Sequence, residues 1–273
     1  MFNNRFRGVI DYYSRTTSDL LLNRPLLALG GEPDGVILSN IGEMRNSGVE
    51  VELNGDLIVT DDWFVKIGGN ISFLDNEVTG LVSSLDDPEG APINRGFTTI
   101  RIGEEINTFF IPRYAGVNPA NGEPLYYDEN GDVTNAYDAN ANEVLSGKSR
   151  IADFEGGFNT SVSYKNFNLS ADFFFRYGHY IYNIMEANML SDGTGVDANQ
   201  RLDAFNYWRN PGDVNVLPSP LYGNEAQQTS DRFLQKGDYI RLRNLTFGYT
   251  FDSDQLANTG LNSVRIYVQG QNL

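Results

Sequence analysis

The feature that most constrains this chain is an alternation of apolar and polar residues that recurs in seven separate stretches. Alternation with a period of two is typical of β-strands with two unlike faces, and the spacing typical of amphipathic helices is hard to find. The sequence therefore predicts an all-β, antiparallel protein, with strands at residues 5–13, 43–55, 63–74, 154–164, 167–177, 239–251 and 263–273.

The links between these predicted strands alternate between long and short. Residues 75–153 and 178–238 form long links, whereas Lys165 and Asn166 alone join two of the strands. Links this long are uncommon in a compact soluble domain unless they have secondary structure of their own. Transmembrane β-barrels combine short periplasmic turns with long outer loops, and their outward rows contact outer-membrane lipid. The alternation therefore favours part of a transmembrane barrel over a soluble sandwich.

The predicted strand at residues 239–251, YIRLRNLTFGYTF, has two faces that exchange character at Asn244. Arg241 and Arg243 share a row that continues with apolar residues only, namely Leu245, Phe247, Tyr249 and Phe251. We interpret Asn244 as the outer boundary of the hydrocarbon, above which the two arginines face water and anionic lipid head groups. The alternative is a β-bulge that shifts the register of the strand.

The composition excludes several classes of protein. Acidic residues outnumber basic residues 36 to 20, which gives a net charge of −16 and argues against a nucleic-acid partner. The chain has no cysteine, so disulfides, zinc–thiolate sites and thiol nucleophiles are absent. The sequence has no apolar run long enough for a helical membrane span, and its first ten residues, MFNNRFRGVI, lack the apolar core of a secretory signal.

Four segments closely resemble the SusC/RagA family of TonB-dependent outer-membrane transporters. They are NIGEMRNSGVEVEL (40–53), GVNPANGEPLYYDENGDVT (116–134), GDYIRLRNLTFGYTF (237–251) and VRIYVQGQNL (264–273). The segments occur in the family's order and span nearly the whole chain. The resemblance implies a barrel of about 22 strands in the bacterial outer membrane, closed by an N-terminal plug. It also implies import of oligosaccharides or peptides, with a SusD-like lid lipoprotein and energy supplied through the TonB complex.

We expect residues 1–273 to form one part of such a barrel, from the C-terminal half of a longer transporter. The family's plug, TonB-contacting segment and aromatic-ended last strand are not recognisable, and the sequence stops at Leu273 inside a predicted strand. Single-chain bacterial barrels have even numbers of strands, so the seven predicted strands cannot close one. The TonB complex would then act through the missing N-terminal part.

The barrel interpretation points one row of each strand into a wet lumen, where side chains tune selectivity. The expected lining residues are Glu50, Glu52, Asn70, Asn159, Asp172, Arg176, Arg265 and Gln269. Among them, the candidate substrate-binding residues are Glu50, Glu52, Asp172 and Arg176. Two carboxylates on one face could also serve acid–base chemistry. A wet wall is the simpler explanation for residues two apart on one strand.

The segment FNYWRNPGD (205–213) supplies a second set of candidates, Tyr207 and Trp208, in a long outer link. Aromatic residues and arginine are enriched at the energetic centres of protein interfaces, and exposed rings can also stack on sugars. We therefore expect Tyr207 and Trp208 to contact a substrate or a partner protein. The alternative is that they pack within the loop itself.

A barrel enzyme, such as an outer-membrane lipase or protease, would need a nucleophile and a base. The single histidine, His179, is a poor basis for such a site, so we expect a protein that is not an enzyme, with His179 exposed at the barrel rim. The remaining alternative is a soluble all-β carbohydrate-binding module, in which the lipid-facing rows would form the core of a sandwich.

Asp128, Asn130 and Asp132 in the segment DENGDVT have the one-three-five spacing of a calcium loop. An EF-hand requires glycine at the sixth position and glutamate at the twelfth. The chain has Val133 and Ala139 there. A polar turn in an outer loop explains these residues by turn geometry alone. We therefore expect no cofactor, with calcium in this loop as the alternative.

Overall fold

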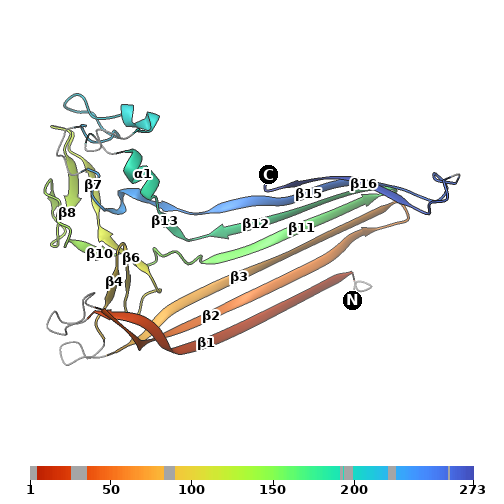
Figure 1. Ribbon diagram of the computed structural model, residues 1–273, viewed down its shortest axis with the longest axis horizontal. Helices are drawn as coiled ribbons and strands as arrows, with labels where there is room; N and C mark the ends of the chain where they lie inside the picture. The colour runs from red at the N-terminus through yellow and green to blue at the C-terminus, as the bar shows by residue number, and fades with distance from the viewer. Residues whose placement is uncertain are drawn as a thin grey trace.

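The computed structural model describes residues 5–25, 36–82, 90–190, 193, 199–220, 226–257 and 259–273. Its main feature is one long, curved, antiparallel sheet of seven strands (Figure 1). The strands are β1 (Phe6–Pro25), β2 (Val36–Val59), β3 (Trp63–Leu81), β11 (Phe154–Tyr164), β12 (Phe167–Tyr177), β15 (Tyr239–Phe251) and β16 (Val264–Gln271). They lie side by side in chain order, so the sheet is an up-and-down meander and all seven predicted strands are confirmed.

The first three strands are longer than the sequence pattern predicts. The prediction ended the first strand at residue 13 and the third at residue 74, but β1 and β3 continue to Pro25 and Leu81. The alternation of apolar and polar residues weakens in these extensions, because their outward side chains are polar while their backbones still pair. Residues 14–42, which separate the predicted strands at 5–13 and 43–55, are therefore mostly strand, and the remainder, residues 26–35, lies outside the described residues.

The short and long connections lie at opposite ends of the sheet. The turns β2–β3, β11–β12 and β15–β16 lie at the right-hand end in Figure 1, and the long links extend from the left-hand end. The long links fold into small elements of their own. Those elements are β4 (Ile93–Arg95), β5 (Thr98–Ile100), β6 (Thr108–Pro112), β7 (Tyr114–Val117), β8 (Pro124–Tyr127), β9 (Val133–Thr134), β10 (Asn142–Val144), β13 (Tyr180–Tyr182), β14 (Leu234–Lys236), helix α1 (Ile184–Met189) and the 3-10 turns η3 (Leu202–Phe205) and η4 (Asp231–Phe233).

Most of the buried side chains lie in this loop region and not along the seven-stranded sheet. Buried clusters form around Ile93 and Ile100, around Phe109 and Ile111, and around Phe233. The first cluster also includes Leu22, Ile41 and Val78, which lie toward the loop ends of β1, β2 and β3. The sheet instead exposes apolar side chains: Ile10 is 73% exposed and Val268 74% exposed. A sandwich would cover these side chains with a second sheet, so the soluble alternative is disfavoured.

The sheet has an apolar face and a polar face, because residues paired directly across neighbouring strands point to the same side. The apolar face is bounded by two rows of mostly aromatic residues. The lower row contains Trp63, Tyr164, Phe167 and Tyr249, and the upper row contains Tyr12, Val49, Phe73, Phe154 and Tyr177. Between the rows, β11 and β12 have 11 residues each. This length suits a tilted strand that crosses a bilayer, and aromatic girdles mark the two interfaces of membrane barrels.

Above the upper aromatic row, the apolar face of β1 to β3 becomes polar without any change of register. Phe73 is followed on this face by Asp75 and Glu77, and Glu77 forms an ion pair with Arg45 of β2. The backbone geometry continues while the solvent changes from lipid to water. A change of solvent along a regular strand, which the sequence suggested for β15, therefore occurs on β1 to β3.

On β15 itself, the exchange of faces has another cause. Asp172 of β12 pairs with Asn244, and the next residue, Phe173, pairs with Leu242, so Arg243 is the extra residue of a β-bulge. The bulge keeps Leu242 on the apolar face and places Arg241 on the polar face. The interpretation of Asn244 as a solvent boundary, with both arginines facing outward, is therefore wrong. The alternative of a register-shifting bulge is correct, although it occurs in the seven-stranded meander and not in a sandwich.

The single histidine is buried, not exposed at the rim as expected. His179 is only 7% exposed, because the chain folds back over it as β13 and β14 pair beyond the end of β12. The backbone N–H of Gly237 donates to the His179 carbonyl at 2.8 Å, and a side chain at Gly237 would collide with the imidazole. Burial, together with the neighbouring Arg176, lowers the pKa of His179 below its usual value.

Candidate functional site

The polar face of the sheet carries the candidate site. Because the strands are in register, residues from five or six strands line up in rows across the sheet, and most of them are polar. The row nearest the loops contains Asp11, Glu50, Ser72, Glu155, Arg176 and Tyr239, and the next contains Val9, Glu52, Asn70, Gly157, Phe174 and Arg241. A third row contains Asn54, Gly68, Asn159, Asp172 and Asn244.

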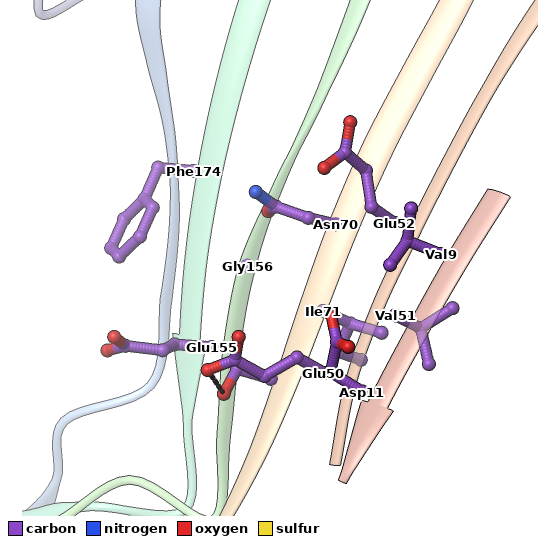
Figure 2. Close-up of a pocket in the computed structure, with 11 residues that line it drawn as sticks. Val9, Asp11, Glu50, Val51, Glu52, Asn70, Ile71, Glu155, Gly156 and Phe174 are labelled. Atoms are coloured by element: carbon purple, nitrogen blue, oxygen red, sulfur yellow. Dashed lines mark hydrogen bonds between the residues drawn. The ribbon is translucent and has the colours of Figure 1, made fainter. Parts of the chain in front are cut away.

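An acidic hollow of about 300 Å³ lies on this face, over β1, β2, β3 and β11. Figure 2 shows four carboxylates along it, those of Asp11, Glu50, Glu52 and Glu155. Glu50 accepts a hydrogen bond from the Ser72 hydroxyl at 3.5 Å, drawn as a dashed line. None of the residues that line this hollow, all of them described, is basic. The hollow is therefore acidic, and one of its carboxylates, that of Glu155, is paired with Arg176 of β12.

A second hollow of about 500 Å³ adjoins the first and shares Glu52, Asn70 and Phe174 with it. It adds Asp172 from β12 and Arg243 from β15. The guanidinium of Arg243 lies over the Phe174 ring, 4.5 Å from its centroid. The bulge in β15 thus places the guanidinium of Arg243 on the polar face, where the sequence pattern predicts mainly acidic side chains.

Basic side chains gather on the polar face of β12 and β15. Arg176 lies at the boundary between the basic side chains and the acidic hollow, because its Nε is 3.4 Å from the Glu155 carboxylate. Arg241 lies over the ring of Tyr239, 5.2 Å from its centroid, and Tyr239 is 6.0 Å from Phe174 between ring centroids. The polar face therefore carries carboxylates toward β1 and guanidinium groups toward β15.

Two of the predicted candidates lie in the loop region, apart from the polar face. The indole N–H of Trp208 donates to the Pro119 carbonyl at 3.0 Å, and its ring packs against Gly122 so closely that a side chain there would collide with it. Trp208 thus joins two loops. The ring of Tyr207 carries the Arg209 guanidinium 4.6 Å above its centroid.

The loop at Asp128 forms a hydrogen-bonded turn. The Asp128 carboxylate accepts hydrogen bonds from the backbone N–H groups of Asn130 and Asp132, both at 2.9 Å. These contacts account for the aspartate by turn geometry. Within the described ranges, no three acidic, histidine or cysteine side chains are grouped so that they could hold a metal ion.

The structure brings together most of the residues predicted from the sequence. Glu50 and Glu52 line the first hollow, Asp172 lines the second, and Arg176 contacts Glu155 between the acidic and basic sides. Sequence reasoning omitted four residues from the candidate site: Asp11, Glu155, Arg241 and Arg243. The alternation identifies Asp11 and Glu155 as facing the same side, whereas the two arginines become visible only once the bulge is recognised.

Together these features define a class of protein, because a meander with an apolar band between aromatic rows, and a polar opposite face, is the wall of a transmembrane β-barrel. In the part of the chain that the structure describes, no helix is both long and apolar enough to cross a membrane.

Comparison with known proteins gives the family. The family model "TonB dependent receptor-like, beta-barrel" matches residues 1–184, so the chain belongs to this family of outer-membrane proteins. It is 32% identical to TonB-dependent receptor P3 of Formosa agariphila, over 100% of this chain and 28% of that protein. It is 28% identical to TonB-dependent receptor SusC of Bacteroides thetaiotaomicron, over 92% of this chain and 25% of that protein.

A solved structure shows the same architecture. The RagAB peptide transporter contains a chain that matches with a TM-score of 0.86 and 27% identity, over 100% of this chain and 30% of that chain. The resemblance to SusC and RagA inferred from the sequence is thereby confirmed. This chain spans less than a third of the length of these relatives. The relatives are receptors and transporters and not enzymes.

Proposed function

We propose that this chain forms part of the wall of an active importer in the bacterial outer membrane, one that takes up oligosaccharides or peptides. The observation that carries the proposal is the polar face, where Glu50, Glu52 and Asp172 line two adjoining hollows opposite the lipid-facing band. Arg176 pairs with Glu155, which lines the first of these hollows. A barrel that only anchored a surface domain would have no need of such hollows. The similarity to SusC and to the RagAB transporter supports the same function.

The proposed importer works with a SusD-like lipoprotein that covers the loop end of the barrel. The name RagAB of the similar transporter indicates a complex of two components. The loops of this chain form a structured surface at one end of the sheet, where such a second component could bind. Trp208 stabilises that surface through its hydrogen bond to the Pro119 carbonyl. Tyr207 and Arg209 add an aromatic ring and a guanidinium group, which are residue types that partner proteins commonly contact. Energy for import would come from the TonB complex, through parts of the full-length transporter outside this chain.

The test of import uses the full-length transporter in its own host. Deletion of its gene should abolish growth on one class of nutrient, oligosaccharide or peptide, and loss of TonB should have the same effect. A plasmid copy of the gene should restore growth. Unchanged growth of the deletion strain on both classes would count against the proposal.

The test of the partner is co-purification from outer membranes. A tagged full-length transporter should retain a surface lipoprotein, and Tyr207→Ala with Arg209→Ala should reduce the amount retained. The control is Val133→Ala on β9, a side chain that is 54% exposed elsewhere in the loop region. Equal retention by all three proteins would rule out Tyr207 as a contact.

A further inference from the structure

Phe174 of β12 breaks the alternation of apolar and polar residues on its strand. It lies on the polar face, in the row of Asn70 and Arg241, whereas Phe173 and Phe175 on either side of it lie on the apolar face. An apolar ring on a face that water wets keeps unfavourable contact with that water. Departures from an otherwise regular pattern are expected at functional positions. Phe174 is therefore a candidate contact on the wall.

The ring of Phe174 is held in place by β15. The guanidinium of Arg243 lies over the ring, 4.5 Å from its centroid, and the ring of Tyr239 lies 6.0 Å away between centroids. A cation over an aromatic ring is attracted to its electron-rich face. Arg243 is the extra residue of the bulge in β15, so the bulge supplies this contact. The wall thus presents the ring in a fixed orientation.

A gap lies beside the ring, because its neighbour in the row has no side chain. Gly157 of β11 pairs with Phe174 on one side and with Asn70 on the other. Neighbouring strands are about 4.8 Å apart, so the backbones of Asn70 and Phe174 are about 10 Å apart. A flat group in contact on both sides needs about 7–8 Å. Asn70 and Phe174 line both hollows, so the hollows adjoin at this gap.

Asn70 adds a polar group on the other side of the gap. Its side-chain oxygen accepts a hydrogen bond from the backbone N–H of Gly157 at 2.8 Å, which orients the amide. Figure 2 shows this amide extending toward the side of the wall on which Phe174 lies. The amide nitrogen carries two further N–H donors. The gap is therefore bounded by an apolar ring and by a hydrogen-bond donor.

We propose that Phe174 is a specificity-determining residue of the importer, against which a substrate places an apolar face while one of its oxygens accepts a hydrogen bond from Asn70. This inference rests on the proposed import function and adds one contact to it. The chemistry recognised is a flat apolar surface beside a hydrogen-bond acceptor. A sugar ring and a peptide with an apolar side chain both offer it. Arg243 is a positioning residue, because it acts through the ring.

The test measures the growth rate of the host against nutrient concentration, with variants of the full-length gene supplied on a plasmid to the deletion strain. The nutrient is the one on which the deletion strain fails, either casein peptides or the polysaccharide digest on which the host grows. Phe174→Ala should raise the half-saturating concentration about tenfold and leave the maximal rate unchanged, because it removes a contact to substrate. Phe174→Tyr keeps the ring and should stay near the wild type.

Tyr267→Ala is the matched control. Tyr267 lies on the same polar face, on β16, and has the Arg265 guanidinium 5.6 Å from its ring centroid, but it lines neither hollow. This variant should match the wild type in both growth parameters. Arg243→Gln should raise the half-saturating concentration about threefold at an unchanged maximal rate, because it releases the ring of Phe174. Immunoblots of outer membranes should show equal amounts of every variant.

Two kinds of failure are distinguishable. An unchanged half-saturating concentration in Phe174→Ala, an equal rise in Tyr267→Ala, or a fall in the maximal rate alone would overturn the role of Phe174 and leave the import function standing. Normal growth of the deletion strain on both nutrients would overturn the import function itself.

Discussion

At the scale of single residues, neighbouring side chains on a strand of this sheet meet different solvents. Thr246 and Phe247 are adjacent on β15, yet Thr246 pairs with Ser170 on the polar face, and Phe247 pairs with Leu169 on the apolar face. Phe247 is 52% exposed on that face, where lipid would cover it. The same substitution at the two positions should therefore have opposite consequences.

We expect Phe247→Arg to destabilise the full-length barrel by about 1–2 kcal/mol, because it places a cation against hydrocarbon one row above the lower aromatic row, where the cost is smaller than at the midplane, where it is about 2–4 kcal/mol. Thr246→Arg should cost little, because its side chain extends into a wet lumen. The measurement is the denaturant midpoint of the full-length protein folded into lipid vesicles, with the wild type as reference. If Thr246→Arg is as damaging as Phe247→Arg, the assignment of the two faces is wrong.

His179 gives a prediction about pH. Its pKa is lowered in the folded protein, mainly by burial, so the unfolded loop binds a proton more readily than the folded loop. The stability of the β13–β14 region should therefore fall as pH drops below about 6.5, the usual histidine value. Hydrogen exchange of the β13 and β14 amides, corrected for the intrinsic effect of pH, should show faster opening at pH 5 than at pH 8.

A variant without the titrating group provides the comparison for this prediction. His179→Gln removes the imidazole and should flatten the dependence of exchange on pH, even if it raises opening at every pH. A wild-type dependence that persists unchanged in His179→Gln would mean that another group is responsible.

At the scale of elements, the bulge in β15 sets the chemistry of the wall. Strands β12 and β15 are regular on both sides of Arg243, and this one residue lets Arg241 and Asn244 lie on the same face. Without a bulge, residues 241 and 244 of a strand point to opposite faces. The extra residue therefore decides which way the upper part of β15 presents its arginines.

Deletion of Arg243 should leave the barrel folded, because Leu242 and Asn244 then become neighbours and still pair with Phe173 and Asp172. Deletion of Thr246 should prevent folding, because it reverses the faces of every residue on one side of the gap. The measurement is the shift in gel mobility between heated and unheated samples of the full-length protein. Equal loss of the folded band in both deletions would contradict the bulge.

At the scale of the whole molecule, the two ends of the sheet differ in kind. The end with short turns contains Lys165 and Asn166, whose backbone continues the hydrogen bonds of the neighbouring strands. The other end carries the small sheets and α1 that fold from the long links (Figure 1). In outer-membrane barrels, short turns face the periplasm and long loops face the outside.

A cysteine at Asn140 should therefore react with an impermeant maleimide on intact cells that make the full-length protein, because Asn140 is exposed at the loop end. A cysteine at Asn166 should react only after the outer membrane is opened. Gly223, which would serve the same purpose as Asn140 by sequence, lies outside the described residues. Labelling at Asn166 on intact cells would show that the orientation is inverted.

Much of the fold could be predicted because the alternation in this chain is a local property. A period of two assigns Glu50 and Glu52 to one face and Leu53 to the other, whatever strand lies beside them. The burial of His179 could not be predicted in this way, because β13 and β14 that enclose it come from opposite ends of a long link. Their pairing depends on the packing of Phe233 and its neighbours, which has no short-range signal.

The sequence by itself determined the seven strands, their two faces and the family, since each depends on the order of residues within a strand or a segment. Only the tertiary structure decided which charges face each other across strands, and so the division between the acidic and basic ends of the wall. The physical reason is register: hydrogen bonds between strands fix it, and one extra residue, Arg243, reverses the facing of every side chain beyond it.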